Sequence, residues 1–266
     1  MEFLCPICGG ILNREGKTLR CESGHSFDIA RQGNVHLLPV QQKHSKNPGD
    51  TREQVLSRRT FLESGAYTPI VEAVRSAALK HVQEGPILDV GCGEGYYCTR
   101  LAQALGAELT GLDISKEAVR CAAAKYKNAT WVCGTAAHLP VGDDSIGTLT
   151  SLFALPLPEE FYRVRAKDGL YFQVLAAQDH LLGLKSIIYP ELKLKDKDSI
   201  PELPGFERIR SIPIRFTFTV EGTQVQNLLS MTPHMYRISK EGAARLAATE
   251  KLTDTASAVL NIFRKI

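Results

Sequence analysis

Three cysteines and a histidine near the N-terminus have the types and spacing of a metal site. In this 266-residue chain Cys5 and Cys8 form a C-x2-C pair, and Cys21 and His25 follow as C-x3-H. Structural zinc sites use four such ligands in a tetrahedron, and Cys3His is a common set. A hairpin tip at residues 13–17 would bring the two pairs together. The pattern predicts a structural zinc ion.

Two other interpretations of these cysteines are unrelated buried thiols and a redox pair. A segment of 35 residues cannot build an adequate core without a metal ion or another cross-link, which argues against unrelated buried thiols. A redox C-x2-C motif requires a βαβ context that is missing here. The chain has seven cysteines, and the other four are scattered. This usage is typical of a reduced, cytoplasmic protein rather than of a disulfide framework.

A second candidate site is a glycine-rich turn that follows an apolar segment at 86–90. Gly91, Gly93 and Gly95 alternate along the turn, and Asp113 ends the next apolar segment. Glycine permits a tight turn and a close approach by a ligand. A carboxylate at the end of the second strand can accept both ribose hydroxyls of an adenosine. The pattern therefore predicts a site for an adenosine-containing cofactor.

Two cofactors compete for this turn, and a βα turn without a ligand is a third interpretation. NAD folds prefer G-x-G-x-x-G, which places a pyrophosphate at the helix N-terminus, whereas the spacing here is G-x-G-x-G. S-adenosylmethionine has no pyrophosphate but carries an ammonium and a sulfonium. Asp89 and Glu94 would form an acidic rim that suits these cations. We therefore expect S-adenosylmethionine.

The elements that must position these residues alternate between strands and helices. This alternation indicates parallel strands with crossover helices, an α/β doubly wound, Rossmann-like methyltransferase sheet, with a small N-terminal zinc-ribbon module. We expect a zinc-binding ribbon at 1–35, a connector with helices at 36–84 and the methyltransferase domain at 85–266. Strands are expected at 86–90, 107–114, 129–133, 146–153, 169–175, 207–212, 214–220 and 256–263. Helices are expected at 52–64, 69–83, 96–105, 116–126, 179–188, 223–230 and 239–249.

Composition excludes several classes of protein. Hydrophobic residues make up 44% and charged residues 23% of the chain, as in ordinary globular proteins. The sequence has no apolar run long enough to span a membrane and no N-terminal pattern of a signal peptide. The net charge of +3 is concentrated in residues 1–60, which hold nine basic and six acidic side chains. A basic face that meets nucleic acid is therefore conceivable there, beside the simpler reading of a solvated surface of mixed sign.

The chain also resembles the bacterial 23S ribosomal RNA guanine-N1 methyltransferases. The resemblance is close across residues 1–140 and weaker but continuous afterwards. It implies methylation of N1 of a guanine in a hairpin of large-subunit ribosomal RNA that lines the exit tunnel, with S-adenosylmethionine as donor and a homodimer as the active form. The stretches that carry it are the Cys/His set, FDIARQGNVHLLPVQQKHSKNPGD (27–50), SRRTFLESGAY (57–67) and LDVGCGEGYY (88–97).

The resemblance also implies residue roles. The zinc ligands of the family match Cys5, Cys8, Cys21 and His25. Positions that contact the cofactor match Tyr67, Gly93, Glu94 and His180. The chain departs from the family on the substrate side, with FALP at 153–156, Gly147 in place of an acidic residue and AKDG at 166–169.

The reaction requires that the proton on guanine N1 be removed, and the sequence assigns no base to that step. Phe153 could stack on the target base or belong to the core. Two alternatives remain beside the RNA enzyme. One is a methyltransferase that acts on a small molecule, and the other is a non-catalytic RNA-binding protein with a degenerate methyltransferase fold.

Overall fold

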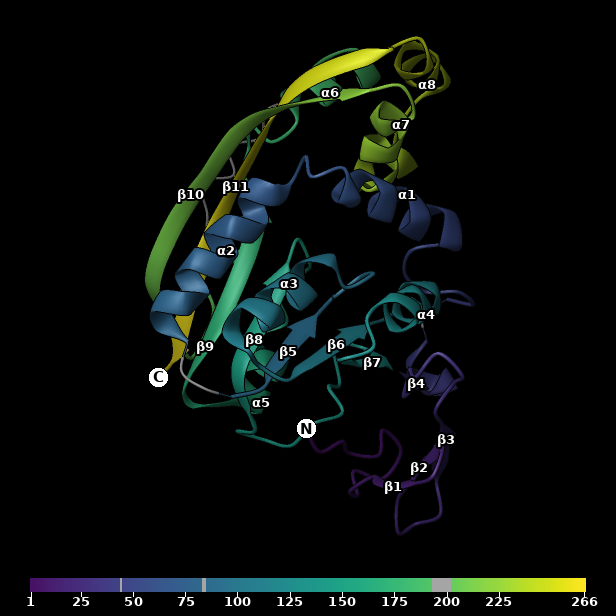
Figure 1. The fold of residues 1–266 in the computed structure, drawn as a ribbon, viewed down its shortest axis with the longest axis vertical. Coiled ribbons are helices and arrows are strands. Elements are labelled where there is room, and N and C mark those ends of the chain that lie inside the picture. Colours follow the sequence, from purple (N-terminus) through teal and green to yellow (C-terminus); the bar gives the residue numbers. More distant parts are fainter. Residues whose placement is uncertain (44, 83–84, 193–201) are drawn as a thin grey trace.

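A computed structural model describes residues 1–43, 45–82, 85–192 and 202–266. Its main sheet has eight strands, which are β4 (Val35–His36), β5 (Ile87–Val90), β6 (Leu109–Asp113), β7 (Thr130–Cys133), β8 (Ile146–Leu152), β9 (Arg165–Ala176), β10 (Phe206–Glu221) and β11 (Lys251–Lys265). Their order is β10-β11-β9-β8-β5-β6-β7-β4 (Figure 1). Strands β4 to β9 run parallel to one another, and β11 is antiparallel to both β9 and β10. The expected α/β doubly wound sheet is confirmed.

The helices alternate with the strands as the sequence predicts. They are α1 (Arg52–Glu63), α2 (Thr68–His81), α3 (Tyr96–Leu105), α4 (Lys116–Lys125), α5 (Pro158–Val164), α6 (Leu182–Ile188), α7 (Thr223–Ser230) and α8 (Lys240–Ala247), with short 3-10 turns η1 (Val40–Gln42) and η2 (Pro233–Tyr236). Helix α5 was not expected. Residues 83–84 lie outside the described residues, and so does the expected domain boundary there.

The chain order reverses between β5 and β8, which lie side by side at the centre of the sheet. All four residues of β5 are buried, as expected for a parallel strand that is covered on both faces. In an open α/β sheet, ligands bind beyond the carboxyl ends of the strands at such a switch point. The glycine turn follows β5 and Asp113 ends β6, so both lie at this edge.

The C-terminal strands differ from the expectation. The sequence suggests two strands around Pro213, but β10 is one continuous strand in which Pro213 pairs with Val259 of β11. Strand β10 forms one edge of the sheet, where the missing N–H of proline disrupts no second ladder. Strand β11 also begins five residues before the expected Ala256.

The N-terminal module is a three-stranded antiparallel sheet of β1 (Asn13–Glu15), β2 (Thr18–Arg20) and β3 (Ser26–Asp28). It is attached to the main sheet, because Leu12 and Leu19 share one apolar cluster with Leu88 of β5 and Val132 of β7. The chain then enters the main sheet directly as β4, which lies parallel to β7.

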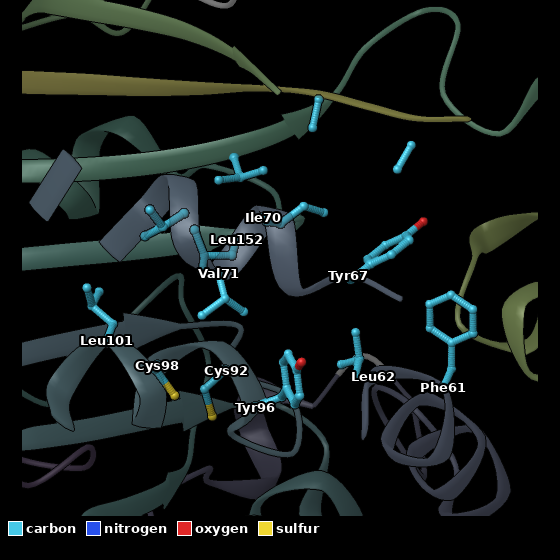
Figure 2. Packing of buried hydrophobic residues seen from close by; sticks show 14 of the residues in the cluster. Phe61, Leu62, Tyr67, Ile70, Val71, Cys92, Tyr96, Cys98, Leu101 and Leu152 are labelled. Atoms are coloured by element: carbon cyan, nitrogen blue, oxygen red, sulfur yellow. The ribbon is translucent and has the colours of Figure 1, made fainter. Parts of the chain in front are cut away.

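Helices α1 and α2 contribute aromatic and aliphatic side chains, among them Phe61 and Ile70, to the buried cluster that Figure 2 shows. Helix α1 begins with a capping box, in which the Gln54 N–H donates to Thr51 Oγ1 and the Thr51 N–H donates to Gln54 Oε1. The buried rings of Phe61 and Tyr67 meet edge to face with centroids 5.0 Å apart. This packing fixes the segment between α1 and α2, where Tyr67 lies.

Candidate cofactor and metal sites

The four predicted metal ligands lie together at the base of the ribbon. Their ligand atoms are all within 4.8 Å of one another. Cys8 Sγ lies 3.6 Å from Cys21 Sγ, and His25 Nδ1 lies 3.6 Å from Cys5 Sγ and 3.4 Å from Cys21 Sγ. A tetrahedral zinc with Zn–S of about 2.3 Å and Zn–N of about 2.0 Å requires ligand separations of roughly 3.5–3.8 Å. The donor set and its spacing therefore fit zinc.

Hydrogen-bonded turns shape the two segments that carry the ligands. The Gly9 N–H donates to the Cys5 carbonyl at 2.8 Å, and the Gly24 N–H donates to the Cys21 carbonyl at 2.9 Å. A hydrogen bond from the Gly10 backbone N–H is the main cause that lowers the pKa of Cys8 to about 6. The thiolate that a metal needs is thus favoured near neutral pH.

The three glycines of the turn share a left-handed backbone conformation but have different surroundings. All three have positive φ, at 77° for Gly91, 57° for Gly93 and 85° for Gly95. A Cβ on Gly91 would lie 2.5 Å from Ala154 Cβ, and one on Gly95 would lie 2.5 Å from the Trp131 ring. On Gly93 the nearest atom would be Arg58 Cδ, 3.9 Å away. Close neighbours therefore explain the glycines at 91 and 95, whereas Gly93 is less crowded, with only Arg58 beside it, and is where a ligand can approach.

Asp113 is tied to the same turn. Its carboxylate accepts the Gly93 N–H and the Ser115 N–H, each at 2.8 Å and each on a different oxygen. Each oxygen keeps a further acceptor position for a ribose hydroxyl. Burial raises the pKa of Asp113, and the two backbone N–H groups lower it. The geometry suits the predicted role, with the carboxylate oriented before the cofactor arrives.

The acidic rim differs from the expectation. Asp89 is 3% exposed, accepts a hydrogen bond from Thr150 Oγ1 at 2.5 Å and has its pKa raised to about 6, chiefly by burial. Glu94 is 1% exposed, and its Oε2 lies 3.3 Å from Arg59 Nε. Both carboxylates are thus buried beneath the turn rather than on its rim. Only Glu94 keeps an unpaired buried oxygen, Oε1.

Tyr67 and His180 come together from distant segments. The Tyr67 hydroxyl lies 3.4 Å from His180 Nε2, and His180 Nδ1 contacts the backbone of Ser257 at 2.9 Å from its O and 3.1 Å from its N. Burial lowers the pKa of His180 to about 4, so the imidazole is neutral at pH 7. Both ring nitrogens are engaged within the protein, which suits a residue that shapes the pocket.

An aromatic series connects this pair to the glycine turn. The Phe153 ring lies 6.1 Å from the His180 ring and 6.2 Å from the Tyr97 ring, between centroids. Phe153 follows β8 and has a left-handed φ of 59°, an uncommon conformation that is concentrated at functional sites. Tyr97 is in the first turn of α3, and its buried hydroxyl has no partner among the described residues.

Sequence reasoning missed three residues beside the turn. Arg58 ion-pairs with Asp50 at 2.6 Å and lies over Gly93, and Arg59 reaches the buried Glu94. The Asp50 carbonyl accepts a hydrogen bond from Ser115 Oγ at 2.6 Å, which attaches the connector to the start of α4. The only sequence signal for these residues is the basic pair in the SRR segment, and that pair does not indicate which acidic groups the arginines contact.

Comparisons with known proteins match both modules. A zinc-ribbon family model described as RlmA, N-terminal, matches residues 3–46, and one described as Methyltransferase domain matches residues 87–169. The 23S rRNA (guanine(748)-N(1))-methyltransferase of Streptomyces fradiae is 31% identical over 253 residues, which cover 92% of this chain and 89% of that protein. A candidate 23S rRNA (guanine-N(1)-)-methyltransferase of Micromonospora griseorubida is 32% identical over 291 residues, covering 98% and 97%.

Solved structures match more weakly. The crystal structure of a candidate methyltransferase from Bacillus halodurans C-125 has a TM-score of 0.49 and 17% identity, covering 73% of this chain and 99% of that one. Within the described part of the chain, no helix is long and apolar enough to cross a membrane.

Proposed function

The chain belongs to the family of 23S rRNA guanine-N1 methyltransferases, and we propose that it transfers a methyl group from S-adenosylmethionine to N1 of a guanine in large-subunit ribosomal RNA. The observation that carries the proposal is the hydrogen bond from the Gly93 N–H to the Asp113 carboxylate, at the switch point of a methyltransferase sheet. The same chain carries the zinc-ribbon module of this family.

The residues that would hold the donor are those at the carboxyl edge of β5 and β6. Asp113 would accept hydrogen bonds from the ribose hydroxyls. The cofactor would pass close to the backbone of Gly93, and Tyr67 with His180 would close the pocket. The donor supplies the methyl group on a sulfonium, and the protein contributes mainly orientation, worth roughly 7–11 kcal/mol in well-aligned cases. The metal ligands would be Cys5, Cys8, Cys21 and His25, with zinc in a structural role.

Recognition of RNA has support from two exposed surfaces. The ribbon carries exposed basic side chains, Arg14, Lys17 and Arg20. Tyr236, at the end of η2, is 69% exposed, yet its hydroxyl accepts a hydrogen bond of 2.5 Å from Gln54 Nε2 at the α1 cap. An exposed aromatic ring that is held in one orientation is a platform on which an unpaired base can stack.

The decisive experiment is methylation of ribosomal RNA by the purified protein with a labelled donor, followed by mapping of the modified nucleotide. The proposal expects label at N1 of a single guanine in a hairpin of 23S RNA. Donor binding without RNA methylation would favour a small-molecule substrate. Absence of donor binding would favour the non-catalytic RNA-binding alternative.

Two further parts of the proposal rest on family resemblance. The active form would be a homodimer, which analytical ultracentrifugation of the zinc-loaded protein would test. Its site of action would be the cytoplasm, because its substrate is the RNA of bacterial ribosomes.

A further inference from the structure

The proposed cofactor site is acidic, although the cofactor itself carries a carboxylate. Asp113 lies at the glycine turn, and Asp89 and Glu94 are buried beneath it. These carboxylates suit the sulfonium and the ammonium of S-adenosylmethionine. The amino-acid part of the same molecule ends in a carboxylate, which they repel and which needs strong hydrogen-bond donors once it leaves water. The site therefore requires a cation that can reach the cofactor.

Two consecutive arginines of α1 come close to the glycine turn, and one of them is engaged within the protein. Arg59 Nε lies 3.3 Å from Glu94 Oε2, and Arg59 Nη2 donates to the Cys121 carbonyl at 2.9 Å. Consecutive residues of a helix do not face the same way. Arg58 therefore leaves the helix in another direction and is the arginine of this pair that can meet a ligand.

Arg58 lies on the least crowded face of Gly93. A Cβ on Gly93 would have Arg58 Cδ as its nearest neighbour, at 3.9 Å. The Arg58 side chain is 28% exposed, and Gly93 is partly exposed as well. A ligand that follows the backbone at Gly93 therefore meets a side chain that solvent also reaches.

The connector orients the Arg58 guanidinium. Arg58 Nη2 donates to Asp50 Oδ2 at 2.6 Å, and the Asp50 carbonyl accepts a hydrogen bond of 2.6 Å from Ser115 Oγ. The Ser115 N–H in turn donates to Asp113. The bond to Asp50 uses one of the five N–H donors of a guanidinium. The planar group is thus held beside the carboxylate that would take the ribose, with donors left for a second carboxylate.

We propose that Arg58 binds the α-carboxylate of S-adenosylmethionine and that Asp50 is the positioning residue for its guanidinium. The assignment rests on the proposed function and deepens it. It places the ribose at Asp113 and the carboxylate at Arg58, on the two groups that adjoin Gly93. Arg58 would then distinguish the methyl donor from adenosine compounds that lack the carboxylate.

The test is calorimetry of the zinc-loaded protein with S-adenosylmethionine and with decarboxylated S-adenosylmethionine, which lacks only this carboxylate. The wild type should bind S-adenosylmethionine about 10- to 100-fold more tightly, as expected for hydrogen bonds between charged groups. Arg58→Gln should lower that affinity by about the same factor and leave the affinity for the decarboxylated ligand within about twofold. The second affinity also reports that the pocket of the variant is intact.

Two further variants make the result specific. Arg58→Lys keeps the charge but not the planar group, so it should retain part of the preference. Arg52→Gln is the matched control, because it removes an exposed positive charge from the same helix, and it should retain the whole preference.

Three outcomes would overturn the assignment and leave the proposed function standing. They are a wild type that binds both ligands equally, a full preference in Arg58→Gln, and an equal loss of both affinities in that variant. The second would place the carboxylate on other groups, and the third would make Arg58 a structural support of the turn. A wild type that binds neither ligand would refute the proposed function and this assignment together.

Discussion

The zinc ribbon and the glycine turn are both built from closely spaced residues, but they are held in opposite ways. In the ribbon, four side chains converge on one point, and the short strands contribute only a few apolar side chains, such as Leu12 and Leu19, to the cluster on the main sheet. A metal therefore supplies much of the stability of the ribbon. In the glycine turn, backbone N–H groups converge on Asp113, and the packed Trp131 and Ala154 hold the glycines from behind. The first site is a metal cross-link, whereas the second is a cradle that hydrogen bonds and packing within the protein hold.

The largest effect should come from breaking the cross-link. Cys21→Ser should release zinc and disorder β1–β3, because structural zinc contributes about 10–16 kcal/mol in small modules. Donor affinity should remain near wild type, since Cys92, Tyr96 and Trp131 at the glycine turn belong to a different apolar cluster from the ribbon. RNA methylation should fall by at least about 100-fold as the basic side chains lose their positions. Zinc content, calorimetry with S-adenosylhomocysteine and methylation of the RNA hairpin measure the three effects. Wild-type methylation by the zinc-free variant would show that the ribbon does not recognise substrate.

The cradle should fail in the opposite way. Gly93→Val puts a branched side chain on the least crowded face of the turn, beside Arg58, at a φ of 57° that disfavours it. We expect donor affinity to fall by about 100-fold or more while zinc content and the ribbon stay intact. Calorimetry and the far-ultraviolet circular dichroism spectrum separate binding from folding. Undiminished affinity would remove the turn from the cofactor site.

The free energy of unfolding should depend on pH through His180, which lies beside Tyr67. His180 has a pKa of about 4 when folded, against about 6.5 when unfolded. Protons therefore bind the unfolded chain first as the pH falls, and the free energy of unfolding should decrease by about 3 kcal/mol between pH 6.5 and pH 4. His180→Gln should lack this component. Urea denaturation of both proteins at pH 7 and at pH 4.5 measures the difference, and parallel losses would contradict it.

Asp113→Asn keeps the shape of the cradle and removes its charge. The amide can accept only one of the two backbone N–H groups, and the ribose loses a charged acceptor. We expect a loss of about 1–3 kcal/mol in donor binding. The matched control is Asp89→Asn, whose carboxylate is engaged with Thr150 and should matter less for affinity. A loss under about twofold would make Asp113 a purely structural residue.

The smallest effect concerns the exposed platform outside both regions. Tyr236→Ala should weaken binding of the RNA hairpin by about 5- to 10-fold and leave donor affinity unchanged, since one stacked base contributes about 1–3 kcal/mol. Tyr236→Phe keeps the ring but loses the hydrogen bond to Gln54, so it should retain most of the affinity. Fluorescence anisotropy with labelled RNA measures both variants. Equal binding by wild type and the alanine variant would exclude stacking on this ring.

The elements that the sequence predicted best are short and local. Helices α3 and α7 match their expected bounds, because the glycine turn and Gly222 precede them and their apolar residues repeat with helical spacing. The prediction of two strands around Pro213 was wrong, because a proline is tolerated within β10 and the reason is the position of that strand at the edge of the sheet. The two-residue strand β4 has no pattern of its own, and its pairing with β7 and the bridge from Val35 to Ile29 define it.

Spacing over a few residues, or within one βαβ unit, was enough to predict the zinc ligand set, the glycine turn and the position of Asp113. Only the folded chain brings Glu94 to Arg59 and Tyr67 to His180, which is 113 residues away, and buries Arg165 without a hydrogen-bond partner among the described residues. The physical reason is that local spacing fixes which side chains share a turn. Burial and pairing depend on which surfaces the folded chain brings together.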